Sequence, residues 1–402
     1  MLKNLSFKVI IFGFIFTFFS SFGQSYFIGL FNSSIRADLS ISHGQFGTIY
    51  ASATLLSSLV LIWVGKKIDD MNVFKFSLFV ILLLSFACYF FSTIKILFFL
   101  FIGIFLLRLG GQGLMSHTAT TTISRYFNKT RGKALSTIWL GLSLAEFIMP
   151  ILIVFLLTMF YWRDIWLIIS LSVLFILPLI SFLFVRNVSL DSRENISFKE
   201  KNISKVKSWT RSEVLKDYRF YIVTLNMLAM PSIATGVFVY QSFILESKNW
   251  GPYVIAQSFM SYSIASVFTL ALTGILIDKF SSRKLLIYMN LPLLISALIL
   301  FYFDNPISAF FFLGFIGICN GLANVLGSSL WAEMYGVKFI GGIKALTTAL
   351  MVFATAAGTA IFGVFIDAGY TINSIAFFSA TYILTCLFLL FLIRKQLEPV
   401  YL

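Results

Sequence analysis

Long apolar segments separated by short polar ones make up almost the whole chain. Each apolar segment has about 20 residues or more, the length that an α-helix needs to cross the hydrocarbon core of a bilayer. Backbone N–H and C=O groups in lipid must pair within their own segment, which favours helices. The pattern predicts twelve membrane spans, at residues 8–33, 45–64, 75–93, 97–124, 134–160, 164–185, 220–245, 252–277, 284–303, 306–331, 344–367 and 371–393.

The composition supports this interpretation. Of the 402 residues, 59% are hydrophobic and 11% are charged, whereas soluble domains contain about 25% charged residues. A soluble fold could not bury so much apolar surface, so the chain is predicted to be an all-α polytopic membrane protein. The first apolar segment begins near Phe7, is long and lacks a small-residue cleavage pattern. We therefore interpret it as the first span and not as a cleaved signal peptide.

Lysine and arginine are distributed unevenly between the two sides of the membrane. If the N-terminus faces the cytoplasm, all but five of the 30 Lys and Arg residues lie in inner segments; the exceptions are Arg108, inside a span, and Arg36, Lys95, Arg163 and Lys248 outside. The positive-inside rule then predicts cytoplasmic termini and a location in the plasma (cytoplasmic) membrane. The rule also explains the net charge of +14, so we expect no nucleic-acid partner.

One long polar segment divides the twelve spans into two sets of six. Residues 186–219 contain many charges and little hydrophobic pattern, which is typical of a cytoplasmic linker between an N-terminal bundle (1–185) and a C-terminal bundle (220–402). Within this linker, Thr210 and Glu213 have the spacing of a capping box. A short helix is predicted to begin there.

The two halves share short sequence matches at a nearly constant offset. The matching segments are Gly65–Asp69 with Gly274–Asp278, Lys133–Leu135 with Lys344–Leu346, and Gln112–Leu114 with Asn320–Leu322. Because the matches fall at equivalent spans, they predict duplicated halves: two pseudo-symmetric six-helix bundles related as parallel repeats.

The segments after spans two and eight resemble the signature loop of the major facilitator superfamily, Gly-x-x-x-Asp-Arg/Lys-x-Gly-Arg-Arg/Lys. The N-terminal copy departs from it at Asp70 and Asn72, where Arg and Gly are usual. The resemblance implies the major facilitator fold and secondary transport of a small molecule by alternating access in a lipid bilayer. Residues 125–134 are similar to the corresponding link of monocarboxylate and oxalate/formate-type carriers, which favours a carboxylate substrate, although span eight lacks a basic residue.

Charged residues at the inner ends of the spans predict a conformational latch. Asp69 ends an inward-running helix, where the helix dipole disfavours a carboxylate, and the start of span eleven near Lys344 presents a positive helix end on the same side. A carboxylate bridging the two would hold the cytoplasmic face closed; alternatively, Asp69 and Asp278 only terminate helices. The predicted latch comprises Gly65, Asp69, Arg125, Arg131, Gly274, Asp278, Arg283 and Glu333.

Arg108 and Glu146 are the only charged residues predicted near mid-membrane. A charge at that depth costs at least about 2.5–3.5 kcal/mol on insertion scales, so it usually has a task and a partner. The two lie on neighbouring spans with a depth mismatch of roughly 6 Å. Two hypotheses follow: Arg108 attracts an anionic substrate while Glu146 carries a coupling proton, or the pair neutralises itself and braces spans four and five. Arg108 also resembles the superfamily's Arg-x-x-Gln-Gly in span four, with one extra residue before Gln112.

Polar side chains near this pair predict a binding site. Arg108, Gln112 and Ser116 are spaced by four and share one helix face, and the repeat maps the latter two onto Asn320 and Asn324 in span ten. The alternative for the amides is hydrogen bonding between helices. The predicted substrate-binding residues are Arg108, Gln112, Asn320, Asn324, Gln24, Tyr26 and Asn226. His117 lies about half a turn from Arg108 and is expected to face a neighbouring helix.

We therefore predict a proton-coupled, monomeric carrier that takes up a small organic anion. The glycine–proline cluster typical of antiporters is absent around Glu146, which favours symport. An exporter of drug-like solutes and a non-transporting receptor or scaffold are the alternatives. No nucleophile–base constellation or metal spacing suggests an enzyme, and Cys88, Cys319 and Cys386 stand singly in apolar segments. No metal or other cofactor is expected.

Overall fold

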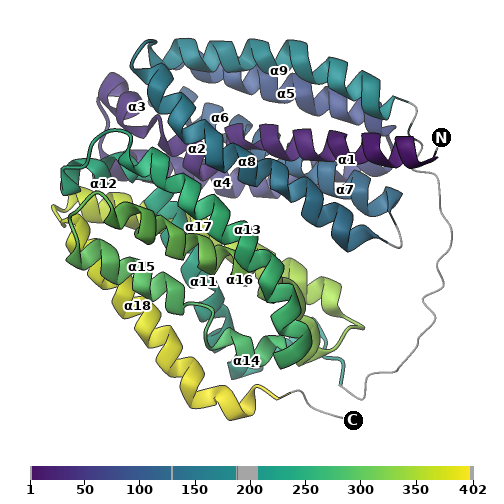
Figure 1. Cartoon of the computed structure of the whole chain (residues 1–402), viewed down its shortest axis with the longest axis vertical. Helices are drawn as coiled ribbons and strands as arrows, with labels where there is room; N and C mark the ends of the chain where they lie inside the picture. Colours follow the sequence, from purple (N-terminus) through teal and green to yellow (C-terminus); the bar gives the residue numbers. More distant parts are fainter. Residues whose placement is uncertain (1, 128–129, 187, 189–206, 399–402) are drawn as a thin grey trace. The chain divides into compact units, whose positions relative to one another are not determined.

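A computed structural model describes residues 2–127, 130–186, 188 and 207–398, apart from the side chains of residues 2–5, 131, 278 and 328. Over these residues the regular secondary structure is entirely helical (Figure 1), and twelve helical segments are long and apolar enough to cross a membrane. Both observations confirm the predicted all-α polytopic fold. Residues 187 and 189–206 of the predicted linker lie outside the described part.

The chain divides into two compact units, of which the first comprises residues 1–197 and 238–242. Its helices pair span one with five, span two with four and span three with six. These helices are α1 (Leu2–Phe19), η1 (Ser20–Gly23), α2 (Ser25–Gly29), α3 (Asn32–Leu39), α4 (His43–Lys66), η2 (Lys67–Asp69), α5 (Val73–Ser92), α6 (Leu97–Leu107), η3 (Arg108–Met115), α7 (Ser116–Tyr126), α8 (Arg131–Leu157) and α9 (Trp162–Val185).

The second unit comprises residues 198–237 and 243–402. Its helices are α10 (Arg211–Val214), α11 (Tyr218–Val239), α12 (Gln241–Lys248), α13 (Val254–Phe280), α14 (Ser282–Leu286), α15 (Leu291–Tyr302), α16 (Ser308–Tyr335), α17 (Ile340–Asp367), α18 (Ile372–Ile393) and η4 (Arg394–Gln396). Span eight packs on ten and span nine on twelve, and Gly358 of α17 lies against the Ser232 backbone of α11. The pairing of spans in the first unit thus recurs in the second.

Local sequence explains several helix starts. Ser42 and Gln45 form a capping box at the start of α4, and Asn72 and Thr371 accept hydrogen bonds from the first turns of α5 and α18. Each side chain satisfies backbone N–H groups that have no partner within the helix. The predicted capping box at Thr210 is confirmed: its N–H donates to Glu213 Oε2 at 2.7 Å.

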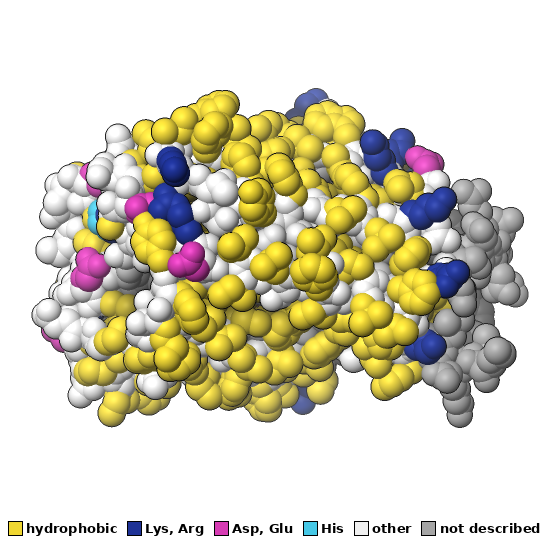
Figure 2. Space-filling view, turned by 90° about the horizontal axis from the view of Figure 1, so that it is seen from above, with side chains coloured by type: hydrophobic (Ala, Val, Ile, Leu, Met, Phe, Trp, Pro, Cys, Tyr) yellow, Lys and Arg dark blue, Asp and Glu magenta, His cyan; other side chains and the backbone are white. Residues whose placement is uncertain are grey.

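The surface and the core of the molecule are both apolar. In the first unit, Phe27, Phe31 and Phe91 surround Trp166 with ring centroids 4.8–5.6 Å apart. Large side chains are also exposed, Phe175 by 71% and Ile275 by 68%, and Figure 2 shows hydrophobic side chains over much of the displayed face. In water such patches would be unfavourable, whereas lipid tails accommodate them.

Four of the predicted spans, including span four described below, are not continuous α-helices, which corrects the sequence prediction. Span one changes to a 3₁₀ turn at Ser20 and breaks at Gln24, whose ψ of 152° is extended. Span seven is interrupted between α11 and α12, and span nine between α14 and α15. The hydrophobic pattern does not reveal these breaks. At the break in span one, the Gly23 carbonyl oxygen accepts a hydrogen bond from Arg108 of span four.

Candidate functional site

Arg108 begins a π-helical segment in the middle of span four. The segment, η3, runs from Arg108 to Met115 between α6 and α7 and contains three glycines. A helix that must accommodate one extra residue widens locally from i→i+4 to i→i+5 hydrogen bonding, and such π segments occur frequently at functional sites. The extra residue before Gln112 therefore agrees with η3, although a continuous α-helix was predicted there.

The π segment lies directly against the break in span one. A Cβ added to Gly111 would come within 2.6 Å of the Gly23 backbone nitrogen. Only glycine permits this approach, because any side chain on either residue would separate the two backbones. The two irregular segments, η1 and η3, thus fit together within the first unit.

Arg108 connects these segments through one edge of its guanidinium group. Its Nη1 donates to the Gly23 carbonyl oxygen at 3.0 Å and to Ser25 Oγ at 3.2 Å. The guanidinium carbon lies 5.3 Å from the centroid of the Tyr50 ring, within the range of a cation–π interaction. The Tyr50 hydroxyl donates to Ser25 Oγ at 2.9 Å. Arg108 is only 3% exposed, so protein groups replace the water that would otherwise surround it.

The other edge of the guanidinium contains an unpaired donor. Among the described residues, Arg108 Nε is buried without a hydrogen-bond acceptor. An unpaired buried donor costs about 1–3 kcal/mol. The Nε–H and one Nη2–H point along the same edge of the planar group, in the fork geometry that matches two oxygens of one carboxylate.

Glu146 lies on α8 but does not pair with Arg108. Among the described residues, no hydrogen bond or ion pair joins Glu146 to Arg108 or to any other group. Its carboxyl is partly buried and lies close enough to Tyr26 for an electrostatic interaction. The roles of Arg108 and Glu146, in transport or in bracing spans four and five, therefore stay predictions.

The other predicted residues of the first unit differ in their surroundings. Tyr26 is buried on α2, immediately after the break. Gln24 and Gln112 are partly buried, and within the described part their side-chain amides form no hydrogen bonds. Their amides are therefore available to a ligand.

In the second unit, the predicted amides bond to one another and to neighbouring helices. Asn320 Nδ2 donates to Ser266 Oγ at 2.9 Å, and Asn324 Nδ2 donates to Asn320 Oδ1 at 3.2 Å. Asn226 is fully buried, where Asn290 Nδ2 donates to its backbone oxygen at 2.6 Å and its side chain at 2.9 Å. Asn320 and Asn226 thus bond to other spans, as the alternative expected, whereas Asn324 bonds within α16. A substrate role for the three residues stays a prediction.

A cavity of about 540 Å³ also opens in the second unit. Its lining includes Lys248, whose Nζ is 2.6 Å from Asp304 Oδ1, and Asn373. None of the predicted substrate-binding residues lines this cavity.

Comparison with known proteins decides the family. The family model described as "Major Facilitator Superfamily" matches residues 13–260, more than half of the chain. The chain belongs to the Major Facilitator Superfamily. It is therefore a transporter and not an enzyme, a multi-pass integral membrane protein that binds a small-molecule substrate within a lipid bilayer.

Solved structures of superfamily transporters share the fold at low sequence identity. A bacterial homologue of the human lysosomal transporter Spinster, inward-facing and occupied, has a TM-score of 0.73 at 13% identity, covering 98% of this chain and 97% of that chain. The nucleoside transporter NupG has a TM-score of 0.74 at 13% identity, covering 98% and 99%. A POT family transporter in complex with 5-aminolevulinic acid has a TM-score of 0.72 at 13% identity, covering 98% and 96%. No curated protein sequence matches the chain.

The N-terminal signature loop of the superfamily is anchored to span four. Asp69 forms an ion pair with Arg125, whose Nη1 also lies 3.4 Å from the Ile68 carbonyl oxygen. Nearby, the Nε2 atom of His117 is 3.0 Å from the Gly65 carbonyl oxygen, and a Cβ on Gly65 would meet the imidazole at 3.3 Å. His117 thus faces a neighbouring helix, as predicted.

The C-terminal signature loop has a different arrangement of charge. Arg283 Nε pairs with Glu333 Oε1 at 2.6 Å, and the Ser282 N–H donates to Glu333 Oε2 at 2.8 Å. Apart from its own helix backbone, no described atom lies within 4 Å of a Cβ built on Gly274. The side chains of Asp278 and Arg131 lie outside the described residues. A latch role for these residues stays a prediction.

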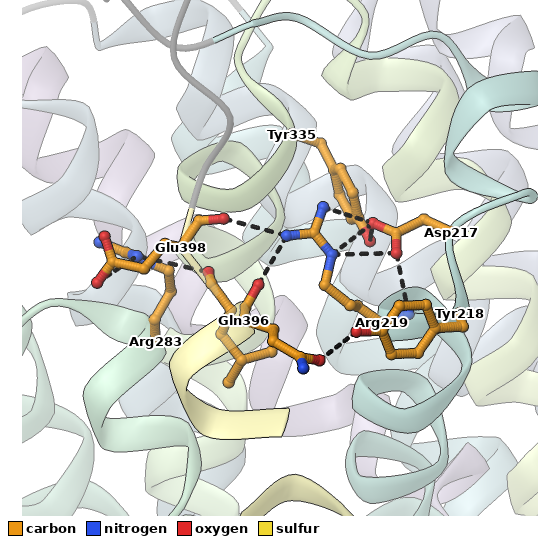
Figure 3. A network of polar contacts seen from close by, with 8 residues as sticks. Asp217, Tyr218, Arg219, Arg283, Tyr335, Gln396 and Glu398 are labelled. Atoms are coloured by element: carbon orange, nitrogen blue, oxygen red, sulfur yellow. Dashed lines mark hydrogen bonds and ion pairs between the residues drawn. The ribbon is translucent and has the colours of Figure 1, made fainter. Parts of the chain in front are cut away.

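A polar network that the sequence did not reveal lies beside Arg283 (Figure 3). Arg219 Nε donates to both Asp217 carboxylate oxygens at 2.9–3.0 Å, and its Nη1 donates to the Gln396 carbonyl oxygen at 2.7 Å and the Glu398 carbonyl oxygen at 3.1 Å. The Tyr335 hydroxyl donates to Asp217 at 3.0 Å. The network ties α11, α16 and the segment after α18 together within the second unit. Its members are up to 181 residues apart, so only Asp217 and Arg219, two residues apart, could have signalled it.

Proposed function

We propose that the protein takes up a small organic anion, such as a carboxylate, by alternating access and with coupling to protons. The observation that carries the proposal is the unpaired, buried Nε of Arg108, which shares an edge of the guanidinium with Nη2. A carboxylate bound at this edge would accept two parallel charge-assisted hydrogen bonds. It would also remove the cost of leaving these donors unpaired.

The opposite edge of Arg108 supports the same proposal. Because Nη1 is held by Gly23 and Ser25, the guanidinium cannot turn freely away from a ligand. The neighbouring amides of Gln24 and Gln112 can donate to further oxygens of the substrate. Pre-organised donors bind more tightly because less conformational freedom is lost on binding.

Glu146 is the proposed carrier of the coupling proton. A carboxyl at membrane depth without an ionic partner favours the neutral form, and a change in its surroundings during transport can release the proton. Since Glu146 forms no ion pair with Arg108 in the described part of the structure, Glu146 can bind the proton while Arg108 binds the anion. We further propose that the protein works as a monomer in the plasma (cytoplasmic) membrane, with both termini in the cytoplasm.

Uptake into proteoliposomes tests the proposal. Carboxylates, sugars, amino acids, cations and drug-like compounds would be offered with the outside more acidic than the inside. We expect accumulation of at least one carboxylate, and a KM at least about tenfold higher in Arg108→Lys, because lysine keeps the charge but not the fork. Arg163→Lys, at the outer end of α9, controls for the general effect of replacing arginine.

Each other result has a defined meaning. Movement of only a sugar, an amino acid or a cation contradicts the anion proposal. Drug efflux with an unchanged Arg108→Lys variant favours the exporter, and the absence of any transport favours the receptor or scaffold.

A further inference from the structure

We infer that Tyr50 is a positioning residue that fixes the orientation of Arg108 and thereby sets the affinity for the anion. The inference rests on the proposed function of Arg108. Tyr50 lies on α4, a helix that contributes no residue to the predicted substrate-binding set. It acts on the arginine through two contacts that converge on the same guanidinium group.

The first contact is the aromatic ring. The Arg108 guanidinium carbon lies 5.3 Å from the ring centroid, and Tyr50 is fully buried. A cation over an aromatic face is attracted by the ring quadrupole, more strongly where water is excluded. The ring therefore contacts one side of the guanidinium group.

The second contact is the hydroxyl. Tyr50 donates to Ser25 Oγ at 2.9 Å, and Ser25 Oγ also accepts from Arg108 Nη1 at 3.2 Å. A serine oxygen has two lone pairs, so these two bonds use its full capacity as an acceptor. With both pairs occupied, Ser25 is fixed as an acceptor for Nη1 and does not compete for the Nε/Nη2 edge.

Together, the contacts immobilise one edge and one side of the guanidinium and leave Nε on the other edge without a partner. A group held in this way loses less rotational freedom when an anion binds. The effect of Tyr50 on binding should therefore pass through Arg108 and disappear when the fork is removed. A tyrosine that merely supported the fold would act independently of residue 108.

A double-mutant cycle tests the inference. The wild type, Tyr50→Phe, Arg108→Lys and the double variant would be purified. For each protein, the unfolding temperature would be measured against the concentration of sodium acetate, lactate or benzoate, with sodium chloride as the reference salt. The half-saturating concentration is the one that gives half of the maximal rise in unfolding temperature. Tyr50→Phe keeps the ring and removes the hydroxyl, so we expect a half-saturating concentration about 2- to 10-fold higher. In the Arg108→Lys background, Tyr50→Phe should change the half-saturating concentration less than twofold.

Two further variants keep the result interpretable. Ser25→Ala removes the shared acceptor and should weaken binding to a similar extent even if Tyr50→Phe folds poorly. Tyr89→Phe, whose tyrosine is 52% exposed on α5, should leave the half-saturating concentration unchanged.

The outcomes separate the inference from the proposed function. If Arg108→Lys weakens binding but Tyr50→Phe does not, or if the two effects add, the positioning role is wrong and the anion proposal stands. If no probe stabilises the wild type more than chloride, or if Arg108→Lys binds as well as the wild type, the proposed function fails and the positioning role fails with it.

Discussion

Arg108 Nη1 donates to the carbonyl oxygen of Gly23, the last residue before the break in span one. An interrupted helix leaves backbone carbonyls without partners, which is unfavourable at membrane depth. The arginine therefore has a structural role on one edge of its guanidinium and an unpaired Nε on the other. The two tasks can be separated by substitution, because lysine can still bond to a carbonyl oxygen but cannot form a planar fork.

The contact between Gly23 and Gly111 predicts a strong effect of adding one methyl group. A Cβ on Gly111 would lie 2.6 Å from the Gly23 nitrogen, so Gly111→Ala should separate the backbones and destabilise the protein by about 1–3 kcal/mol. Thermal unfolding in detergent measures the change. Gly341→Ala is the control, because no heavy atom lies within 4 Å of its Cβ, and it should be neutral or slightly stabilising. An unchanged unfolding temperature in Gly111→Ala would show that η1 and η3 are not in contact.

The ion pair of Asp69 and Arg125 should matter more for transport than for stability. Both side chains are partly exposed, 47% and 33%, and exposed pairs contribute about 0–1 kcal/mol. Arg125→Gln should therefore change the unfolding temperature little but lower the transport rate severalfold if the pair belongs to the predicted latch. Asp70→Asn, at the adjacent exposed carboxylate, should leave transport unchanged. Equal transport by Arg125→Gln and wild type would remove Arg125 from the latch.

Glu146→Gln should uncouple transport from protons. A glutamine cannot release a proton, so accumulation driven by a pH gradient should be lost while exchange of internal for external substrate continues. Both are measured in the same proteoliposomes, with Glu246→Gln, at an exposed position of α12, as the control. Accumulation at the wild-type level in Glu146→Gln would exclude this residue as the coupling group.

The capping box at Thr210 predicts a dependence of stability on pH. The Thr210 N–H, together with Lys207, holds the pKa of the Glu213 carboxyl at about 2, below its ordinary value of 4.5. A pKa lowered by folding stabilises the protein at pH values above 4.5, and this contribution is lost as the pH falls from 4.5 towards 2. The difference in unfolding temperature between wild type and Glu213→Ala should therefore narrow over this interval. A constant difference from pH 6 to pH 3 would mean that the charge of Glu213 does not contribute.

The spans and their order could be predicted from the sequence because lipid imposes a length and a composition on each helix. The capping box at Thr210 was also predictable, since its two partners are three residues apart. The contact of His117 with a neighbouring helix was predictable too, because helical spacing places this residue about half a turn from Arg108.

The breaks in spans one, seven and nine leave no signal in the hydrophobic pattern, and the break in span one is supported by residues far away in the chain. Gly23 and Gly111 lie 88 residues apart, and their contact has no local signal. The π segment had a local signal, the extra residue before Gln112. That signal could be interpreted as a π segment only once its packing against the break in span one was known. The pairing of Asn226 with Asn290 likewise requires two spans to be adjacent.

The most direct test of the central claim is an experimental structure with a bound carboxylate, the one transported fastest by the wild type. The account predicts that the two carboxylate oxygens lie about 2.7–2.9 Å from Nε and Nη2 of Arg108, while Nη1 remains on Gly23. A carboxylate bound elsewhere, with Arg108 paired to Glu146 or with its Nε/Nη2 edge still unoccupied, would contradict the account.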